Sequence, residues 1–220
     1  MLKYIKDKFF KQRVELIGPK SILFLTPSLN NEVGSISIDT KTNEKRLIIA
    51  DDNWRYTEFV HQDQSEIIEK ELKAIWDIHT NHKASVGWNK VYVRSVITEP
   101  LMPARILLQT LYDLFPNRSD FSGVAYWDTD GVVDYGFAFH TDGGLKIYGQ
   151  HYPETNIKYL RSICFEPCSM HDKDSLLDEL ATLSKFAKQH QFHLICWNKL
   201  LHFEPSATQY LEFFGQHYHE

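Results

Sequence analysis

An internal repeat in the second half of the chain limits the possible folds more than any other pattern. Segment 92–100 (Tyr-Val-Arg-Ser-Val-Ile-Thr-Glu-Pro) and segment 159–167 (Tyr-Leu-Arg-Ser-Ile-Cys-Phe-Glu-Pro) agree at Tyr, Arg, Ser, Glu and Pro. Each segment is followed by a leucine-rich stretch and then an apolar stretch, at 107–114 and 121–127 in the first copy and at 176–183 and 192–198 in the second. Three matches in the same order indicate two copies of one structural unit.

Each copy has the pattern of a strand, a turn, a helix and a second strand. Pro100 and Pro167 end the first strands because proline has no N–H for a ladder. Pro103 suits the first turn of the helix that follows in copy one. Two βαβ units with right-handed crossovers predict an α+β fold, a two-layer ferredoxin-like sheet over about residues 90–198. The first strands of the copies would lie side by side in its middle, with both helices on one face.

The segment between the copies predicts an inserted β-hairpin. Asp-Gly turns at 130–131 and 142–143 flank strand-like runs at 132–140 and 145–151. We expect this hairpin to extend the sheet from the edge strand at 121–127.

The first part of the chain predicts a smaller extension. A buried strand at 21–26 and short strands at 35–39 and 46–50, the last two joined as a hairpin, precede an amphipathic helix at 64–81. A further helix is expected at 1–11, docked on the body or lying on a membrane surface, and another at 206–215. We therefore predict an N-terminal α+β subdomain or extension at 1–85 and a repeat domain at 86–220.

The repeated Tyr-x-Arg pattern gives the first candidate binding site. Strand side chains alternate faces, so Tyr92 and Arg94 share one face, as do Tyr159 and Arg161. The intervening small and apolar positions, Cys164 among them, suit packing under the helices. An open sheet face with two tyrosines and two arginines would be a platform for a ligand or partner.

The alternative for this face is a structural one. The N-terminal half would cover the Tyr-x-Arg face, and acidic residues such as Glu99 or Glu166 would neutralise the arginines.

The inserted hairpin gives the second candidate site. A two-residue turn at 142–143 would place Asp134 opposite His151, so that the carboxylate could hold the imidazole in one tautomer as a general base. The alternative is an ordinary cross-strand polar pair.

The cysteines and histidines predict no metal or cofactor site. Zinc-type ligands occur in the second half, but without the paired spacing of zinc motifs, at Cys164, Cys168, His171, His193 and Cys196. Three sparse cysteines also argue against a disulfide framework, which predicts a reducing, cytoplasmic location.

The distribution of charge indicates the kind of partner. Residues 1–20 carry six Lys/Arg against two acidic residues, so that, of the total net charge of −5, the other 200 residues carry −9. An acidic body repels nucleic acid and attracts basic proteins. No apolar run reaches the roughly 20 residues of a transmembrane helix, so no membrane span is expected.

No motif in the chain specifies a reaction. The Gly-x-Ser-x-Gly, Walker, Gly-x-Gly-x-x-Gly and His-Glu-x-x-His patterns are missing. We therefore predict a cytoplasmic protein-binding module without catalytic activity, of the kind found among bacterial immunity proteins, which neutralise toxins. That likeness lies in composition alone. The alternatives are an enzyme or small-ligand-binding protein that uses the Asp134/His151 pair or the Tyr/Arg face, and a homo-oligomer formed through an exposed sheet edge.

Overall fold

The computed structural model describes residues 23–30, 36–38, 45–50, 54–94, 97, 99–127, 131–153, 157–167 and 173–216. The expected helix at 1–11, with Cys168 and His171, lies outside these residues. The helices are α2 (Ser65–Asn81), α3 (Leu108–Asp113), α4 (Lys173–Gln189) and α5 (Ala207–Gln216). A short 3-10 turn at Gln62–Gln64 leads into α2.

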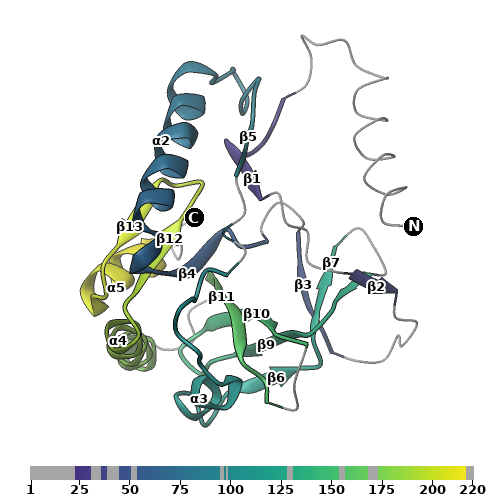
Figure 1. The fold of residues 1–220 in the computed structure, drawn as a ribbon, viewed down its shortest axis with the longest axis vertical. Coiled ribbons are helices and arrows are strands. Elements are labelled where there is room, and N and C mark those ends of the chain that lie inside the picture. The colour runs from purple at the N-terminus through teal and green to yellow at the C-terminus, as the bar shows by residue number, and fades with distance from the viewer. Residues whose placement is uncertain are drawn as a thin grey trace.

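The strands of the described residues form three sheets (Figure 1). The largest has the order β13 (Leu201–Phe203), β12 (Phe192–Cys196), β4 (Thr57–His61), β11 (Leu160–Pro167), β10 (Leu145–His151), β9 (Gly136–His140), β6 (Ser119–Phe121). A second has the order β2 (Ile36–Ile38), β8 (Gly131–Val133), β7 (Val124–Tyr126), β3 (Leu47–Ile49). In the third, β1 (Ser28–Asn30) pairs in parallel with β5 (Tyr92–Arg94). The fold thus belongs to the α+β class that the sequence predicts.

Helices α3, α4 and α5 cover one face of the seven-stranded sheet. The leucines of α4 recur at helical spacing and are fully buried at Leu176, Leu180 and Leu183. They pack in one apolar cluster with side chains of the sheet such as Phe59 and Phe192. Burying each such side chain stabilises the fold by roughly 1.5–3 kcal/mol.

The opposite face of the same sheet is packed against two different elements. At one end α2 buries Ile68 and Ile75 against Val60 and Ile195. At the other end the four-stranded sheet packs on β9, β10 and β11, with Trp54 buried in the cluster between them. Figure 1 shows the strands β2, β7 and β3 to the right of the larger sheet, on the side away from α4 and α5.

The predicted central pairing of the two repeat copies is wrong. Strand β5 of the first copy lies in the two-stranded sheet, whereas β11 of the second copy lies in the seven-stranded sheet. The position beside β11 is occupied by β4, whose five residues are all buried. Among the described strands, the two copies therefore do not form one duplicated ferredoxin-like sheet.

The second copy taken alone has the expected strand, helix and strand. Strands β11 and β12 are each antiparallel to β4, so they run parallel to one another with β4 between them. β4 precedes residue 85, where we predicted a boundary, yet both its neighbours follow that residue. The two parts of the chain therefore share one sheet.

The hairpin predictions have different outcomes. Strands β9 and β10 form the expected hairpin, and β6 pairs with β9 at the edge of the sheet. Strands β2 and β3 do not pair with each other, because β2 pairs with β8 and β3 pairs in parallel with β7. The expected strand at 21–26 is replaced, over its described part, by a single bridge between Phe24 and Trp88.

An irregularity in β11 changes which side chains face the helices. His151 pairs with Leu160 and Gln150 with Ser162, so Arg161 is an extra residue in the ladder. Leu160 packs in the helix-facing cluster, but Cys164 packs with Trp54 and Tyr148 on the opposite face. Our expectation that Cys164 faces the helices is therefore wrong.

Candidate functional site

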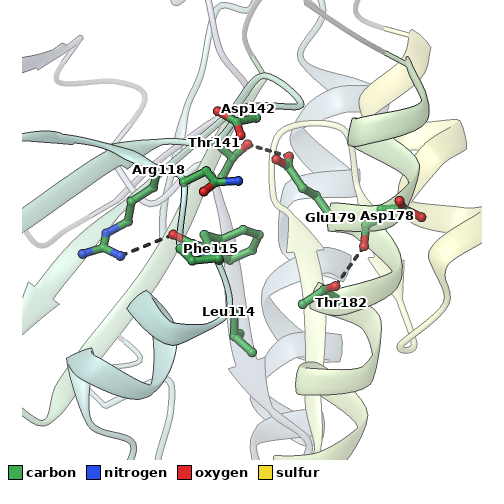
Figure 2. Close-up of a pocket in the computed structure, with 10 residues that line it drawn as sticks. Leu114, Phe115, Arg118, Thr141, Asp142, Asp178, Glu179 and Thr182 are labelled. Atoms are coloured by element: carbon green, nitrogen blue, oxygen red, sulfur yellow. Dashed lines mark hydrogen bonds between the residues drawn. The ribbon is translucent and has the colours of Figure 1, made fainter.

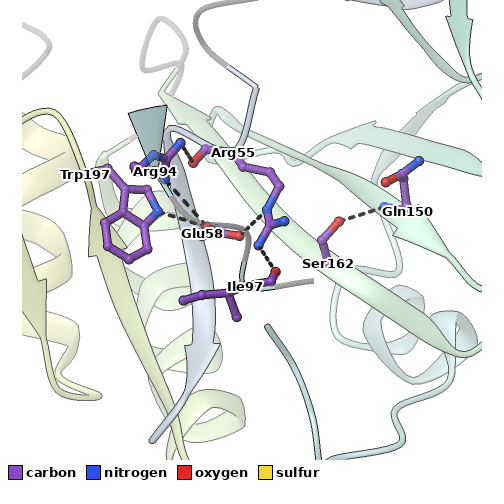
Figure 3. A network of polar contacts seen from close by, with 7 residues as sticks. All are labelled: Arg55, Glu58, Arg94, Ile97, Gln150, Ser162 and Trp197. Carbon is purple, nitrogen blue, oxygen red and sulfur yellow. Dashed lines mark hydrogen bonds and ion pairs between the residues drawn. The ribbon is translucent and has the colours of Figure 1, made fainter. Parts of the chain in front are cut away.

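Arg94, predicted to lie on an open face, is buried in a network of charged side chains. Its exposed fraction is 6%, and its guanidinium lies 4.9 Å from the centre of the Trp197 ring. Its Nη1 atom is 3.9 Å from Glu58 Oε1, and its Nη2 donates to the Arg55 carbonyl at 3.2 Å. Figure 3 shows Glu58 between the Arg94 and Trp197 side chains and that of Arg55.

Glu58 is the centre of this network. One carboxylate oxygen accepts from Arg55 Nε at 2.7 Å and the other from Trp197 Nε1 at 2.8 Å. Arg55 also donates through Nη2 to the Ile97 carbonyl at 2.8 Å, from a backbone with φ of 55°. The network ties the start of β4 to β5 and to the end of β12, which is a structural role.

The charge of Arg94 survives burial. Desolvation lowers the pKa of Arg94 to about 10, while the negative charge of Glu58 opposes that shift. The guanidinium is therefore protonated at neutral pH. Tyr92, two residues before Arg94 in β5, is half-buried and donates to Glu71 Oε1 at 3.3 Å.

The other Tyr-x-Arg residues lie elsewhere. Tyr159 forms an isolated bridge with Leu107, and Arg161 is the half-buried extra residue of β11. Burial raises the pKa of the Tyr152 hydroxyl, and Glu99 raises it further, while Arg161 acts in the opposite direction. Because β5 and β11 belong to different sheets, the four residues do not form the single sheet face that we expected.

The register of the β9–β10 hairpin differs by one residue from our prediction. Gly136 pairs with Gln150, and the turn contains Thr141, whose N–H donates to the Leu145 carbonyl at 2.9 Å. The turn is longer than the two residues we assumed, so Asp134 is not the register partner of His151.

The contacts of Asp134 and His151 agree with this one-residue difference in register. Gln150 Nε2 donates to the Asp134 carbonyl at 3.1 Å. The Nδ1 atom of His151 lies 3.0 Å from the Tyr152 carbonyl oxygen, and its ring packs on that of Tyr135. This geometry therefore does not support the predicted contact between the Asp134 carboxylate and the His151 imidazole.

The two described cysteines are buried thiols. Burial raises the pKa of both Cys164 and Cys196, which keeps them protonated and unreactive. Among the described residues, no group of three or more His, Cys, Asp or Glu side chains is arranged to hold a metal ion.

A pocket between α3, the β9–β10 turn and α4 is the best candidate for a binding site (Figure 2). It has a volume of about 210 Å³. Its walls are the segment after α3 (Leu114, Phe115, Pro116, Asn117, Arg118), the turn (Thr141, Asp142) and one side of α4 (Asp178, Glu179, Thr182). Three of these ten residues carry carboxylates, so the pocket is acidic.

Glu179 connects two walls of the pocket. Its carboxylate accepts from the Thr141 hydroxyl at 2.6 Å and from the Gly143 N–H at 2.7 Å. A Cβ atom at Gly143 would lie 2.6 Å from the Leu176 Cα, so only glycine lets the turn approach α4 this closely. Burial raises the pKa of Glu179, and the nearby Asp142 adds to that rise, while the two hydrogen bonds oppose it.

Arg118, the positively charged residue of the pocket wall, binds residues other than the pocket carboxylates. Arg118 Nε donates to Asp120 Oδ1 at 2.8 Å, and its Nη1 donates to the Tyr112 carbonyl at 3.0 Å. Its guanidinium also stacks over the Tyr112 ring at 3.9 Å. In Figure 2 this side chain extends away from the Glu179 carboxylate, so it does not neutralise the acidic end of the pocket.

Sequence reasoning missed this pocket. The Asp-Gly turn at 142–143 is a visible signal, but it predicts only a hairpin. Asp178 and Glu179 look like ordinary solvated residues of a helix until the fold brings the turn against them.

Comparison with known proteins gives no family assignment. No family model matches the chain, and neither a curated protein nor a solved structure is significantly similar to it. The function must therefore be inferred from the geometry and charge of the site itself.

Proposed function

We propose that this chain is a protein-binding module that takes a basic side chain of another protein into the acidic pocket, without catalysing a reaction. The proposal depends on one observation: Asp142, Asp178 and Glu179 line the same cavity. Arg118, which also lines it, is already paired with Asp120. A lysine or arginine side chain is the complement of such a cavity.

The dimensions of the pocket favour a single side chain over a whole metabolite. Its volume of about 210 Å³ is below the roughly 300–1,000 Å³ of typical small-molecule sites. The apolar wall formed by Leu114 and Phe115 would contact the methylene groups of a long basic side chain.

The charge of the chain supports the same kind of partner. A net charge of −5 would draw a basic protein towards this surface and speed the encounter. Inhibition of a basic toxin, as immunity proteins perform, is one cytoplasmic activity of this kind, and it is the form of the proposal that we favour.

The test uses a peptide as a stand-in for the partner. A ten-residue peptide with one central arginine is titrated into the protein, and the amide signals of Thr141 and Gly143 are followed by NMR. The same peptide with norleucine in place of arginine is the matched ligand control. We expect saturable shifts with the arginine peptide and none with the norleucine peptide.

Two double variants of equal charge change complete the design. Asp178→Asn/Glu179→Gln removes two pocket carboxylates, and Glu66→Gln/Asp77→Asn removes two exposed carboxylates on α2. The pocket variant should bind the arginine peptide about tenfold more weakly, and the α2 variant should bind it as the wild type does. Equal weakening in both variants, or shifts confined to another surface, would overturn the proposal.

A native partner can be tested with the same proteins. Cross-linking in the native lysate should give an adduct with the wild type and the α2 variant that disappears with the pocket variant. An adduct that persists in the pocket variant would place the interface elsewhere.

A further inference from the structure

One hydrogen-bond donor of the buried Arg94 side chain has no acceptor among the described residues. Nη1 and Nη2 of its guanidinium lie towards Glu58 and the Arg55 carbonyl, whereas no atom of the described residues accepts from the Nε–H. The side chain is 6% exposed, so bulk solvent does not reach this group. A buried donor of a charged group without an acceptor is costly, and native proteins almost always provide one. The Nε–H therefore indicates a bound molecule that can accept a hydrogen bond.

A small cavity lies between β1, β4, β5 and α2, beside Arg94. Its volume is about 10 Å³, which is close to what a single water molecule needs and far below the size of a site for an organic ligand. Figure 3 shows part of its wall around Glu58. Polar side chains make up most of the wall: Asn30, Arg55, Glu58, Glu71 and Arg94.

The charges of this wall restrict the ligand further. Two arginines and two glutamates line the cavity, so their formal charges cancel. A cation cannot accept a hydrogen bond from the Arg94 Nε–H, and an anion would lie beside two carboxylates. A water molecule can accept from the guanidinium and donate to a carboxylate at the same time, so it is the small molecule that fits both kinds of wall.

The Glu71 carboxylate is the acceptor that we assign to this water. It belongs to α2, is 1% exposed, and accepts from the Tyr92 hydroxyl at 3.3 Å. A carboxylate offers about four lone-pair positions, so the hydrogen bond from Tyr92 leaves capacity for a further donor. The two oxygens of Glu58 already accept from Arg55 and from Trp197.

We propose that one water molecule is bound permanently in this cavity, where it accepts a hydrogen bond from Arg94 Nε and donates one to the Glu71 carboxylate. The water would connect β5 to α2 and complete the hydrogen bonding of the buried guanidinium. This structural role is separate from the binding of a basic partner at the α3–α4 pocket.

The direct test is NMR of the full wild-type chain in water. The Nε–H signal of Arg94, assigned by its loss in Arg94→Lys, should show a nuclear Overhauser effect to water with the sign of a long-lived contact. A rotating-frame measurement separates this effect from proton exchange, which has the opposite sign. The control is the amide N–H of Leu194, buried within β12, which should show no such effect.

A crystal structure locates the same molecule. We expect an electron-density peak at hydrogen-bond distance, about 2.7–3.2 Å, from both Arg94 Nε and a Glu71 carboxylate oxygen.

Two isoleucine variants test whether the cavity is filled. Ile97 lines the cavity, and the longer side chain in Ile97→Met should enter it, displace the water and leave the Arg94 Nε–H without an acceptor. Ile75→Met, in the same apolar cluster, is the matched control. The water signal should disappear in Ile97→Met alone, and its melting temperature should be about 2–4 °C below that of Ile75→Met.

Three results would overturn the proposal. One is the absence of a long-lived water contact at the Arg94 Nε–H of the wild type. Another is electron density for a different molecule, or for none, in the cavity. The third is a melting temperature of Ile97→Met above that of Ile75→Met, which is the result expected from filling a cavity that holds no water.

Discussion

Trp197 donates a hydrogen bond to Glu58 at 2.8 Å although the two residues are 139 positions apart in the chain. The same carboxylate accepts from Arg55, and the Arg94 guanidinium lies 3.9 Å from it and over the Trp197 ring. One buried acid thus serves three donors or cations from three separate segments. Its removal is the most damaging single change that the network can undergo.

Glu58→Gln should destabilise the fold by about 3–5 kcal/mol, because a glutamine oxygen cannot serve both Arg55 and Trp197 and leaves the buried guanidinium groups without a counter-charge. Urea unfolding measures the free energy. The matched control is Glu166→Gln, which breaks the half-exposed 3.3 Å ion pair with Lys146 and should cost no more than about 1 kcal/mol. Similar costs for the two variants would contradict the structural role of the network.

Gly143→Ala should lower stability by about 1–3 kcal/mol, because the new methyl group would lie 2.5 Å from Glu179 Oε2 and 2.6 Å from the Leu176 Cα atom. The backbone of α4 cannot move away as a flexible side chain can. Thermal melting compares this variant with Asp142→Ala, the exposed neighbouring residue, which should change stability by less than about 0.5 kcal/mol. A neutral Gly143→Ala would show that the turn does not sit against α4.

The pH dependence of stability should carry a contribution from Glu179. Its pKa is raised in the folded state, so the folded chain holds this proton more tightly than the unfolded chain. The resulting stabilisation is fully present below the ordinary glutamate pKa of 4.5 and is lost as the pH rises through the higher folded pKa. The unfolding free energy of the wild type should therefore fall relative to that of Glu179→Gln across this window and run parallel above it. A difference that is constant with pH, or that changes in the opposite direction, would contradict the raised pKa.

Local patterns in the sequence were sufficient to predict helices α2 to α5 and one hairpin, whereas the helix predicted at 1–11 is not tested. Helix α2 and helix α4 follow from apolar residues at helical spacing, and the β9–β10 hairpin follows from the Asp-Gly turn. The length of that turn could not be derived, because Thr141 takes part in it through a backbone bond that has no sequence signature.

The strands that pair with the two repeat copies could not be predicted in the same way. Tyr92 and Tyr159 begin nearly identical segments, but β5 ends at Arg94 and pairs with β1, whereas β11 continues past an extra residue at Arg161. Strand pairing depends on which distant segment fills the neighbouring position, and a five-residue strand from the first part of the chain fills it here. The acid that meets Arg94 is accordingly Glu58, and neither Glu99 nor Glu166 takes that place.

The insertion of β4 between β11 and β12 has a consequence for how the chain is made. β4 leaves the ribosome before either neighbour exists, and its N–H and C=O groups stay without a ladder until β11 and β12 have been synthesised. Throughout that interval the segment Thr57–His61 presents unpaired backbone groups and the apolar side chains of Phe59 and Val60, with which other chains can pair. We therefore expect the yield of folded protein to fall when synthesis between β4 and β12 is slowed.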